Sequence, residues 1–158
     1  MADIRWLDSE ERGAWLALAA MLFTLPPALD SQLQRDEDLT LADYMVLAML
    51  SERTDHQLRM SDLAAAAQTS QSRLSRIVAR LEHAGYVVRS MAPGDRRVVV
   101  ASATEAGLDK VTSATPRHVE KVRQLVLDHL DRDQVRALAD IGAAVLGESC
   151  RTPEPVAG

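Results

Sequence analysis

The segment Ser61–Ser102, SDLAAAAQTSQSRLSRIVARLEHAGYVVRSMAPGDRRVVVAS, contains the pattern that is most specific for one fold. It opens with a short alanine-rich run at 62–67, which favours a helix capped by Ser61. The polar turn at 68–70 separates this run from a longer helical pattern. Gly85 ends that second pattern, because glycine takes up the left-handed conformation that closes many helices. The first part of the segment therefore predicts two helices joined by a tight turn.

Two runs rich in β-branched residues follow, at 87–91 and 98–102. The turn between them, at 92–95, contains Pro-Gly, so the two runs predict a β-hairpin. Helix, turn, helix and hairpin in this order predict a winged helix-turn-helix.

The longer helix has two chemically different faces. Apolar side chains recur at helical spacing along one of them, at Leu74, Ile77, Val78 and Leu81. Small polar residues and arginines, with no acid, occupy the other face, its flanks and the preceding cap. These candidate DNA-binding residues are Ser70, Gln71, Ser72, Arg73, Ser75, Arg76 and Arg80. A helix of this kind fits the major groove, where arginine can read guanine edges.

The expected hairpin carries a second set of candidates at its tip, Asp95, Arg96 and Arg97. Arginine at the tip of a wing can enter a narrow minor groove, drawn by its negative potential. Because phosphates repel a carboxylate, we expect Asp95 to orient an arginine.

Charge is distributed unevenly along the 158 residues, whose net charge is −5. Residues 55–103 hold seven arginines and four acids, a local excess of three positive charges. A basic middle between acidic ends indicates a localised anion-binding face.

The N-terminal part is expected to be helical from a cap at Asp8 or Ser9. Apolar residues at 15–25 suggest burial on more than one side, as in a subunit interface. Since proline lacks an N–H and clashes with the preceding turn, Pro26-Pro27 predicts a kink or a restart. A second helical piece should then run to about Arg35.

Further signals place the remaining elements. Thr40 with Asp43 forms the pattern of a capped helix that runs to about residue 53, and 58–60 can form a short strand. A helix from 104 is expected to be interrupted at Pro116, with Thr115 capping its continuation. Asp131 and Gln134 form a capping box for the last helix.

The stretch 58–107 resembles the MarR (multiple antibiotic resistance regulator) family. The family pattern, Asp-x-Arg followed by Leu-Thr-x-x-Gly, is matched by Asp95, Arg97, Thr104 and Gly107. Ala103 stands where that pattern has leucine. The resemblance implies a homodimer that binds double-stranded DNA at a palindrome and responds to a small aromatic or phenolic effector, with no other cofactor.

The expected fold is mainly α (α+β), a winged lobe with dimerising N- and C-terminal helices. Its predicted parts are N-terminal helices at 8–53, the winged helix-turn-helix at 54–103, C-terminal dimerisation helices at 104–148 and a flexible tail at 149–158. The expected function is that of a cytoplasmic, sequence-specific transcriptional regulator, a repressor by default. The alternative is a winged-helix module that binds a protein instead of DNA.

Arg12 and Trp15 lie about one turn apart and could hold the carboxylate and ring of an effector. The competing interpretation places Trp15 in a dimer core and Arg12 in solvent.

Other classes of function have little support. A single cysteine, Cys150, excludes an internal disulfide and a cysteine-based zinc finger. The four histidines show no metal-binding spacing. Neither a nucleophile elbow nor a phosphate-binding glycine loop is present, so we expect no enzyme. No run of 18 apolar residues occurs, which predicts no membrane span.

Overall fold

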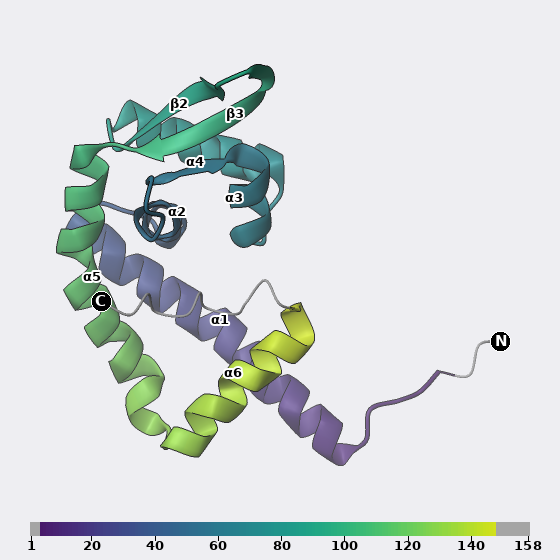
Figure 1. The fold of residues 1–158 in the computed structure, drawn as a ribbon. Coiled ribbons are helices and arrows are strands. Elements are labelled where there is room, and N and C mark those ends of the chain that lie inside the picture. Colours follow the sequence, from purple (N-terminus) through teal and green to yellow (C-terminus); the bar gives the residue numbers. More distant parts are fainter. Residues whose placement is uncertain (1–3, 148–158) are drawn as a thin grey trace.

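The computed structural model describes residues 4–147, apart from the Arg96 side chain, and shows a winged lobe from which long helices extend (Figure 1). Cys150 and the predicted tail at 149–158 lie outside the described residues. The elements in chain order are α1 Ser9–Glu37, α2 Leu41–Ser51, β1 Gln57–Arg59, α3 Met60–Ala66, α4 Gln71–His83, β2 Val87–Ala92, β3 Asp95–Ala103, α5 Glu105–Leu125, a 3-10 turn η1 Leu127–His129 and α6 Arg132–Leu146.

The lobe combines α2, α3 and α4 with a small antiparallel sheet of strand order β1-β3-β2. One core fills it, and its largest fully buried side chains include Leu47, Leu63, Leu74 and Leu81. Ala103, the departure from the family pattern, packs against the edge of this core. The predicted winged helix-turn-helix order is therefore confirmed.

Several predicted helix starts have the expected hydrogen bonds. Capping boxes join Asp8 with Glu11, Thr40 with Asp43, and Asp131 with Gln134. Each cap satisfies N–H groups that the first turn of a helix leaves without partners. Ser61 differs from the prediction, because α3 begins at Met60, two residues before the predicted start, and has Arg59 at its cap position with no side-chain bond. Ser61 instead donates to Asp62 over 3.1 Å.

Pro26 and Pro27 do not divide the first helix, contrary to the predicted restart, since α1 continues through them to Glu37. A proline removes the hydrogen bond to the carbonyl four residues earlier. Here the two carbonyls belong to Leu22 and Phe23, residues that are 58% and 81% exposed on the single chain.

Pro116 likewise lies inside α5 and does not interrupt it. Thr115 was predicted to cap a new helix, but its hydroxyl donates to the carbonyl of Val111 over 2.7 Å. The same hydroxyl lies 3.2 Å from the hydroxyl of Tyr44 on α2. Contact with α2 therefore holds the middle of α5 in place.

The long helix α1 passes a test for a membrane-spanning helix, although the sequence has no uninterrupted run of 18 apolar residues. It contains an 18-residue window of mean hydropathy 1.3, enough by length and composition alone to cross a membrane. Large apolar side chains on its N-terminal half, such as Trp15, Leu16 and Leu22, are more than half exposed. On α6, Ile141 and Val145 are exposed to 59% and 71%. These helices thus present apolar surface that the single chain leaves uncovered.

His118 on α5 is a buried polar group packed against the ring of Tyr44, with ring centroids 4.3 Å apart. Its Nδ1 has no hydrogen-bond partner within the described structure. Burial lowers the pKa of His118 below its ordinary value of 6.5, because the low-dielectric surroundings disfavour the imidazolium.

This burial predicts a loss of stability in mild acid. As the pH falls below about 6.5, the unfolded chain binds a proton at His118 before the folded chain does, so the free energy of unfolding decreases. The decrease has a limiting slope of about 1.4 kcal/mol per pH unit and ends below the folded-state pKa. Urea unfolding at pH 7 and pH 5.5 should show a smaller difference for His118→Gln than for the parent. Equal differences would show that His118 does not contribute.

Candidate nucleic-acid interface

Helix α4 presents one buried and one exposed face, as its sequence pattern predicts. Its apolar stripe is buried, with Leu74 and Val78 fully inaccessible. Ser72, Arg73 and Arg76 are exposed on the other side. The only acid on α4, which is described throughout, is Glu82 in its last turn. An acid-free surface two turns long is therefore available to a polyanion.

The start of α4 is fixed by Ser70, whose hydroxyl accepts from the backbone N–H of Arg73 over 3.3 Å. The hydroxyl of Ser72 lies 3.2 Å from that of Ser70. These contacts set the direction in which the exposed polar side chains of the first turn leave the helix.

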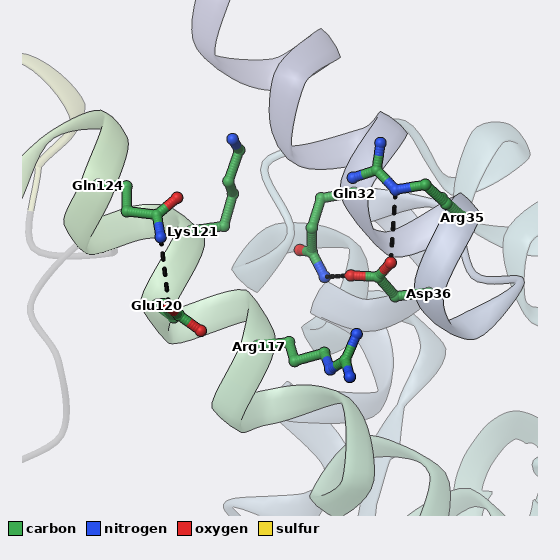
Figure 2. Close-up of a pocket in the computed structure, with 7 residues that line it drawn as sticks. All are labelled: Gln32, Arg35, Asp36, Arg117, Glu120, Lys121 and Gln124. Atoms are coloured by element: carbon green, nitrogen blue, oxygen red, sulfur yellow. Dashed lines mark hydrogen bonds and ion pairs between the residues drawn. The ribbon is translucent and has the colours of Figure 1, made fainter.

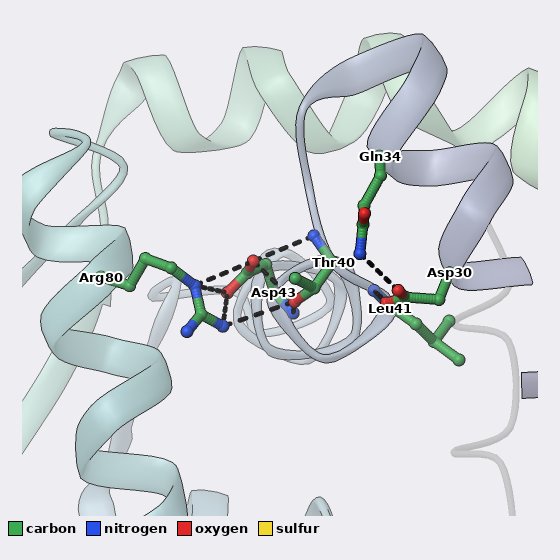
Figure 3. Close-up of polar contacts among 6 residues, drawn as sticks. All are labelled: Asp30, Gln34, Thr40, Leu41, Asp43 and Arg80. Atoms are coloured by element: carbon green, nitrogen blue, oxygen red, sulfur yellow. Dashed lines mark hydrogen bonds and ion pairs between the residues drawn. The ribbon is translucent and has the colours of Figure 1, made fainter. Parts of the chain in front are cut away.

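Arg80 is ion-paired to Asp43 of α2, although its side chain stays 51% exposed. Its Nη2 donates to Oδ1 of Asp43 over 2.6 Å, and its Nε donates to the same carboxylate over 3.1 and 3.2 Å (Figure 3). Asp43 is only 4% exposed and also caps α2. On the other side of this cap, the carboxylate of Asp30 on α1 accepts from the N–H of Leu41 over 2.7 Å. A chain of polar contacts therefore joins α1, the start of α2 and the recognition helix α4.

The wing is the hairpin β2–β3, whose turn is the two residues Pro93 and Gly94. Gly94 has a φ of +85°, a conformation that glycine adopts without a steric penalty. Residues 95–97, which the sequence places at the tip, are the first three residues of β3 and directly follow this turn. Asp95 accepts from the backbone N–H of Arg97 over 2.9 Å, so it fixes the strand just before this arginine.

A groove of about 380 Å³ lies between the wing and the start of α4. Of the predicted residues, it brings together Gln71, Ser75 and Arg97. Arg59 and Ser61 also line it, although the sequence did not mark them as site residues. The pairing of Arg59 with Val100 explains this proximity, because β1 lies beside the wing strand β3. In the sequence, only the local excess of positive charge, to which Arg59 contributes, could have indicated that Arg59 belongs to the site.

Arg89 supplies a further cation to this groove and is anchored to the end of α4. Its guanidinium donates to Glu82 over 2.6 and 2.9 Å. Hydrogen bonding from Arg89 lowers the pKa of Glu82, which keeps that carboxylate charged. The pair ties the base of the wing to α4 and neutralises the acid of that helix.

The two candidate effector-binding residues belong to the start of α1 and do not line the groove beside α4. Arg12 is exposed and Trp15 is 54% exposed, and both belong to the uncovered N-terminal half of the helix. Within residues 4–147 no group of three or more histidine, cysteine or acidic residues could hold a metal ion.

An arginine-bearing helix over a buried stripe, beside a hairpin with further arginines, defines a winged helix-turn-helix protein of the DNA-binding type. Residues 37–98 match the model of the MarR family. The fold also matches a MarR family transcriptional regulator of Streptomyces coelicolor solved in complex with DNA. That structure is 38% identical, with a TM-score of 0.87, over 92% of this chain and 91% of that one. The chain belongs to the MarR family, whose members are transcriptional regulators and not enzymes.

Two other relatives extend the comparison. The HTH-type transcriptional regulator YdcH of Bacillus subtilis is 37% identical over 89 residues, which span 55% of this chain and 60% of YdcH. CouR of Rhodococcus jostii, solved with p-coumaroyl-CoA, has the same fold at 22% identity, with a TM-score of 0.75 over 87% of this chain and 93% of CouR.

Proposed function

We propose that the chain is a cytoplasmic, ligand-responsive repressor that binds a palindromic operator as a homodimer. The observation that carries DNA binding is the exposed, acid-free face of α4 next to the arginine-lined groove of the wing. The structural relative solved with DNA supports it.

Each part of this surface has a proposed role. Ser72, Arg73 and Arg76 project from α4 toward base edges in the major groove, where an arginine can bond to guanine bidentately. Ser70, Gln71 and Ser75 contact phosphates or adaptable base positions at the start of the helix. In the wing, Arg96 and Arg97 reach the minor groove, and Asp95 positions Arg97 through its backbone. Arg80 positions α4 through Asp43 and does not itself bind DNA.

The dimer follows from the apolar surface on α1 and α6. Exposed aliphatic and aromatic side chains on two long helices favour burial against a second copy, since this surface gains about 25 cal/mol per Å² on leaving water. A two-fold dimer places two α4 helices about 34 Å apart and reads half-sites about 10 bp apart. Covering a promoter in this way represses it without a further partner.

Arg97→Ala and Arg76→Ala should weaken DNA binding in different ways. Loss of a positive charge that enters the minor groove without bonding to particular bases lowers the affinity for all sequences and reduces the salt slope by about 1. Loss of a base contact costs about 1–3 kcal/mol on the preferred site only. We therefore expect Arg97→Ala to weaken cognate and random duplexes alike, and Arg76→Ala to reduce the difference between them. Fluorescence anisotropy over a salt series measures both effects.

The same titration tests the alternative function. A winged-helix module that binds a protein would show no duplex binding, or binding that does not change with salt. Either outcome would replace the DNA-binding proposal.

The effector proposal concerns the start of α1, where Arg12 and Trp15 could hold an anionic aromatic molecule. The guanidinium would pair with the carboxylate while the indole stacks on the ring. Added phenolic acids should release the operator complex of the parent and act more weakly on Arg12→Ala. Equal release from both proteins would rule out this site.

A further inference from the structure

A polar groove of about 340 Å³ lies between α1 and α5, on the helices that carry the chain out of the winged lobe (Figure 2). Its seven lining residues are Gln32, Arg35, Asp36, Arg117, Glu120, Lys121 and Gln124. All are charged or carry an amide. The volume falls within the range of small-molecule sites, about 300–1,000 Å³, but such sites are mostly apolar. A ligand of this groove must therefore be small and hydrophilic.

Gln32 is the buried end of the groove and is not fully satisfied. The residue is 4% exposed, and its Nε2 donates to Asp36 over 3.1 Å. Its Oε1 is buried and accepts no hydrogen bond from the described residues. In Figure 2 this oxygen points from α1 toward α5. A buried acceptor without a donor is unfavourable, and a ligand hydroxyl could satisfy it.

The groove also has cations available for an anion. Arg117 and Lys121 lie one turn apart on α5, and neither forms an ion pair within the described part of the chain. Arg35 is engaged with Asp36 over 3.4 Å. The hydrogen bond from Gln32, followed by the charges of Arg35 and Arg117, lowers the pKa of Asp36, which keeps that carboxylate ionised.

The balance of charge decides which anion fits. Three cations face two carboxylates, Asp36 and Glu120, so the groove carries one excess positive charge. A single carboxylate neutralises it, whereas a dianionic phosphate would leave a negative charge beside two acids. With no apolar or aromatic side chain among the lining residues, a ring would gain little contact, but several hydroxyls could bond to the amides and carboxylates.

We propose that the α1–α5 groove binds a small aliphatic polyhydroxy carboxylate, of the sugar-acid type, through its carboxylate on Arg117 and a hydroxyl on Gln32, with Lys121 on the other side of Gln32 (Figure 2). This site is separate from the Arg12–Trp15 region and takes a different chemical class. Its regulatory consequence rests on the proposed function: a ligand that bridges α1 and α5 fixes two helices that connect the dimer surface to the winged lobe.

Gluconate is a suitable probe, with sodium chloride at equal ionic strength and phenylacetate as comparisons. Calorimetric titration of the full chain without DNA should show gluconate binding, with phenylacetate at least tenfold weaker. Arg117→Gln should weaken gluconate binding at least tenfold, the loss of about 1.4 kcal/mol expected for one charge-assisted contact. Arg123→Gln, on the same helix but outside the groove, should leave the affinity unchanged.

Three results would overturn the proposal: no heat above that of sodium chloride, phenylacetate binding as tightly as gluconate, or unchanged affinity in Arg117→Gln. Because no DNA is present, these results leave the proposed DNA binding standing. A chain that binds gluconate but no duplex would instead show that only the proposed function is wrong.

Discussion

An Asp43→Asn variant is expected to bind its operator about tenfold more weakly, a loss of about 1.4 kcal/mol. The substitution removes a negative charge close to the DNA-facing side of α4, and charge alone would make binding stronger. We expect the opposite sign because Asp43 holds Arg80 over 2.6 Å and so fixes α4 against the start of α2. The loss lies between that of an exposed ion pair, below about 1 kcal/mol, and a buried one, about 3–5 kcal/mol.

Glu82→Gln is the matched control for this prediction. It also removes one acid from the same region and frees an arginine, Arg89, but its carboxylate is 36% exposed against 5% for Asp43 and lies at the end of α4. Its operator affinity should equal that of the parent or exceed it. If Asp43→Asn bound more tightly than the parent, Arg80 would be a DNA contact and not a positioning residue. Circular dichroism checks that the helices are kept, and the amide oxygen of asparagine can still accept from the N–H of Thr40, as Asp43 does over 3.0 Å.

A Gly107→Ala variant is expected to lose about 3 kcal/mol of unfolding free energy. A Cβ at this position would lie 2.1 Å from the backbone oxygen of Tyr86 and 3.0 Å from its carbonyl carbon. These are backbone atoms, and the same oxygen accepts from the N–H of Thr104 over 3.0 Å, so they cannot move freely. The junction between the wing and α5 must open to admit the methyl group.

Thermal unfolding measures this effect, and a fall in Tm of about 10 °C is expected for a chain of this size. Gly13→Ala provides the control, because a Cβ on Gly13 of α1 meets nothing within 4 Å. That change should leave Tm unchanged or raise it, since alanine favours a helix by about 1 kcal/mol over glycine. Equal Tm values for Gly107→Ala and the parent would show that the junction is looser than the structure indicates.

Local features of the chain were the most predictable. The capping boxes at Thr40 and Asp131 depend on residues three apart, and the stripe on α4 depends on helical spacing alone. The effect of the prolines was harder to predict. The free-energy cost of Pro26-Pro27 inside a helix depends on whether the carbonyls of Leu22 and Phe23 find other hydrogen-bond donors. Their surroundings belong to the folded chain and are not visible in the sequence.

Contacts distant in sequence were not predictable. Arg80 resembles its neighbours on α4 in the sequence, and only the fold brings it to Asp43, 37 positions earlier. Arg59 likewise joins the candidate site because β1 pairs with β3. The sequence could indicate a DNA-binding face, but it could not show that Arg80 is ion-paired to a carboxylate of α2.

Selection of bound duplexes from a random pool by the full chain tests the central claim most directly. A homodimer that reads DNA with two α4 helices should enrich a palindrome with half-sites about 10 bp apart, and Arg76→Ala should relax the preference at one position in each half-site. A pool that stays random, or that yields an enriched sequence without two-fold symmetry, would contradict the account.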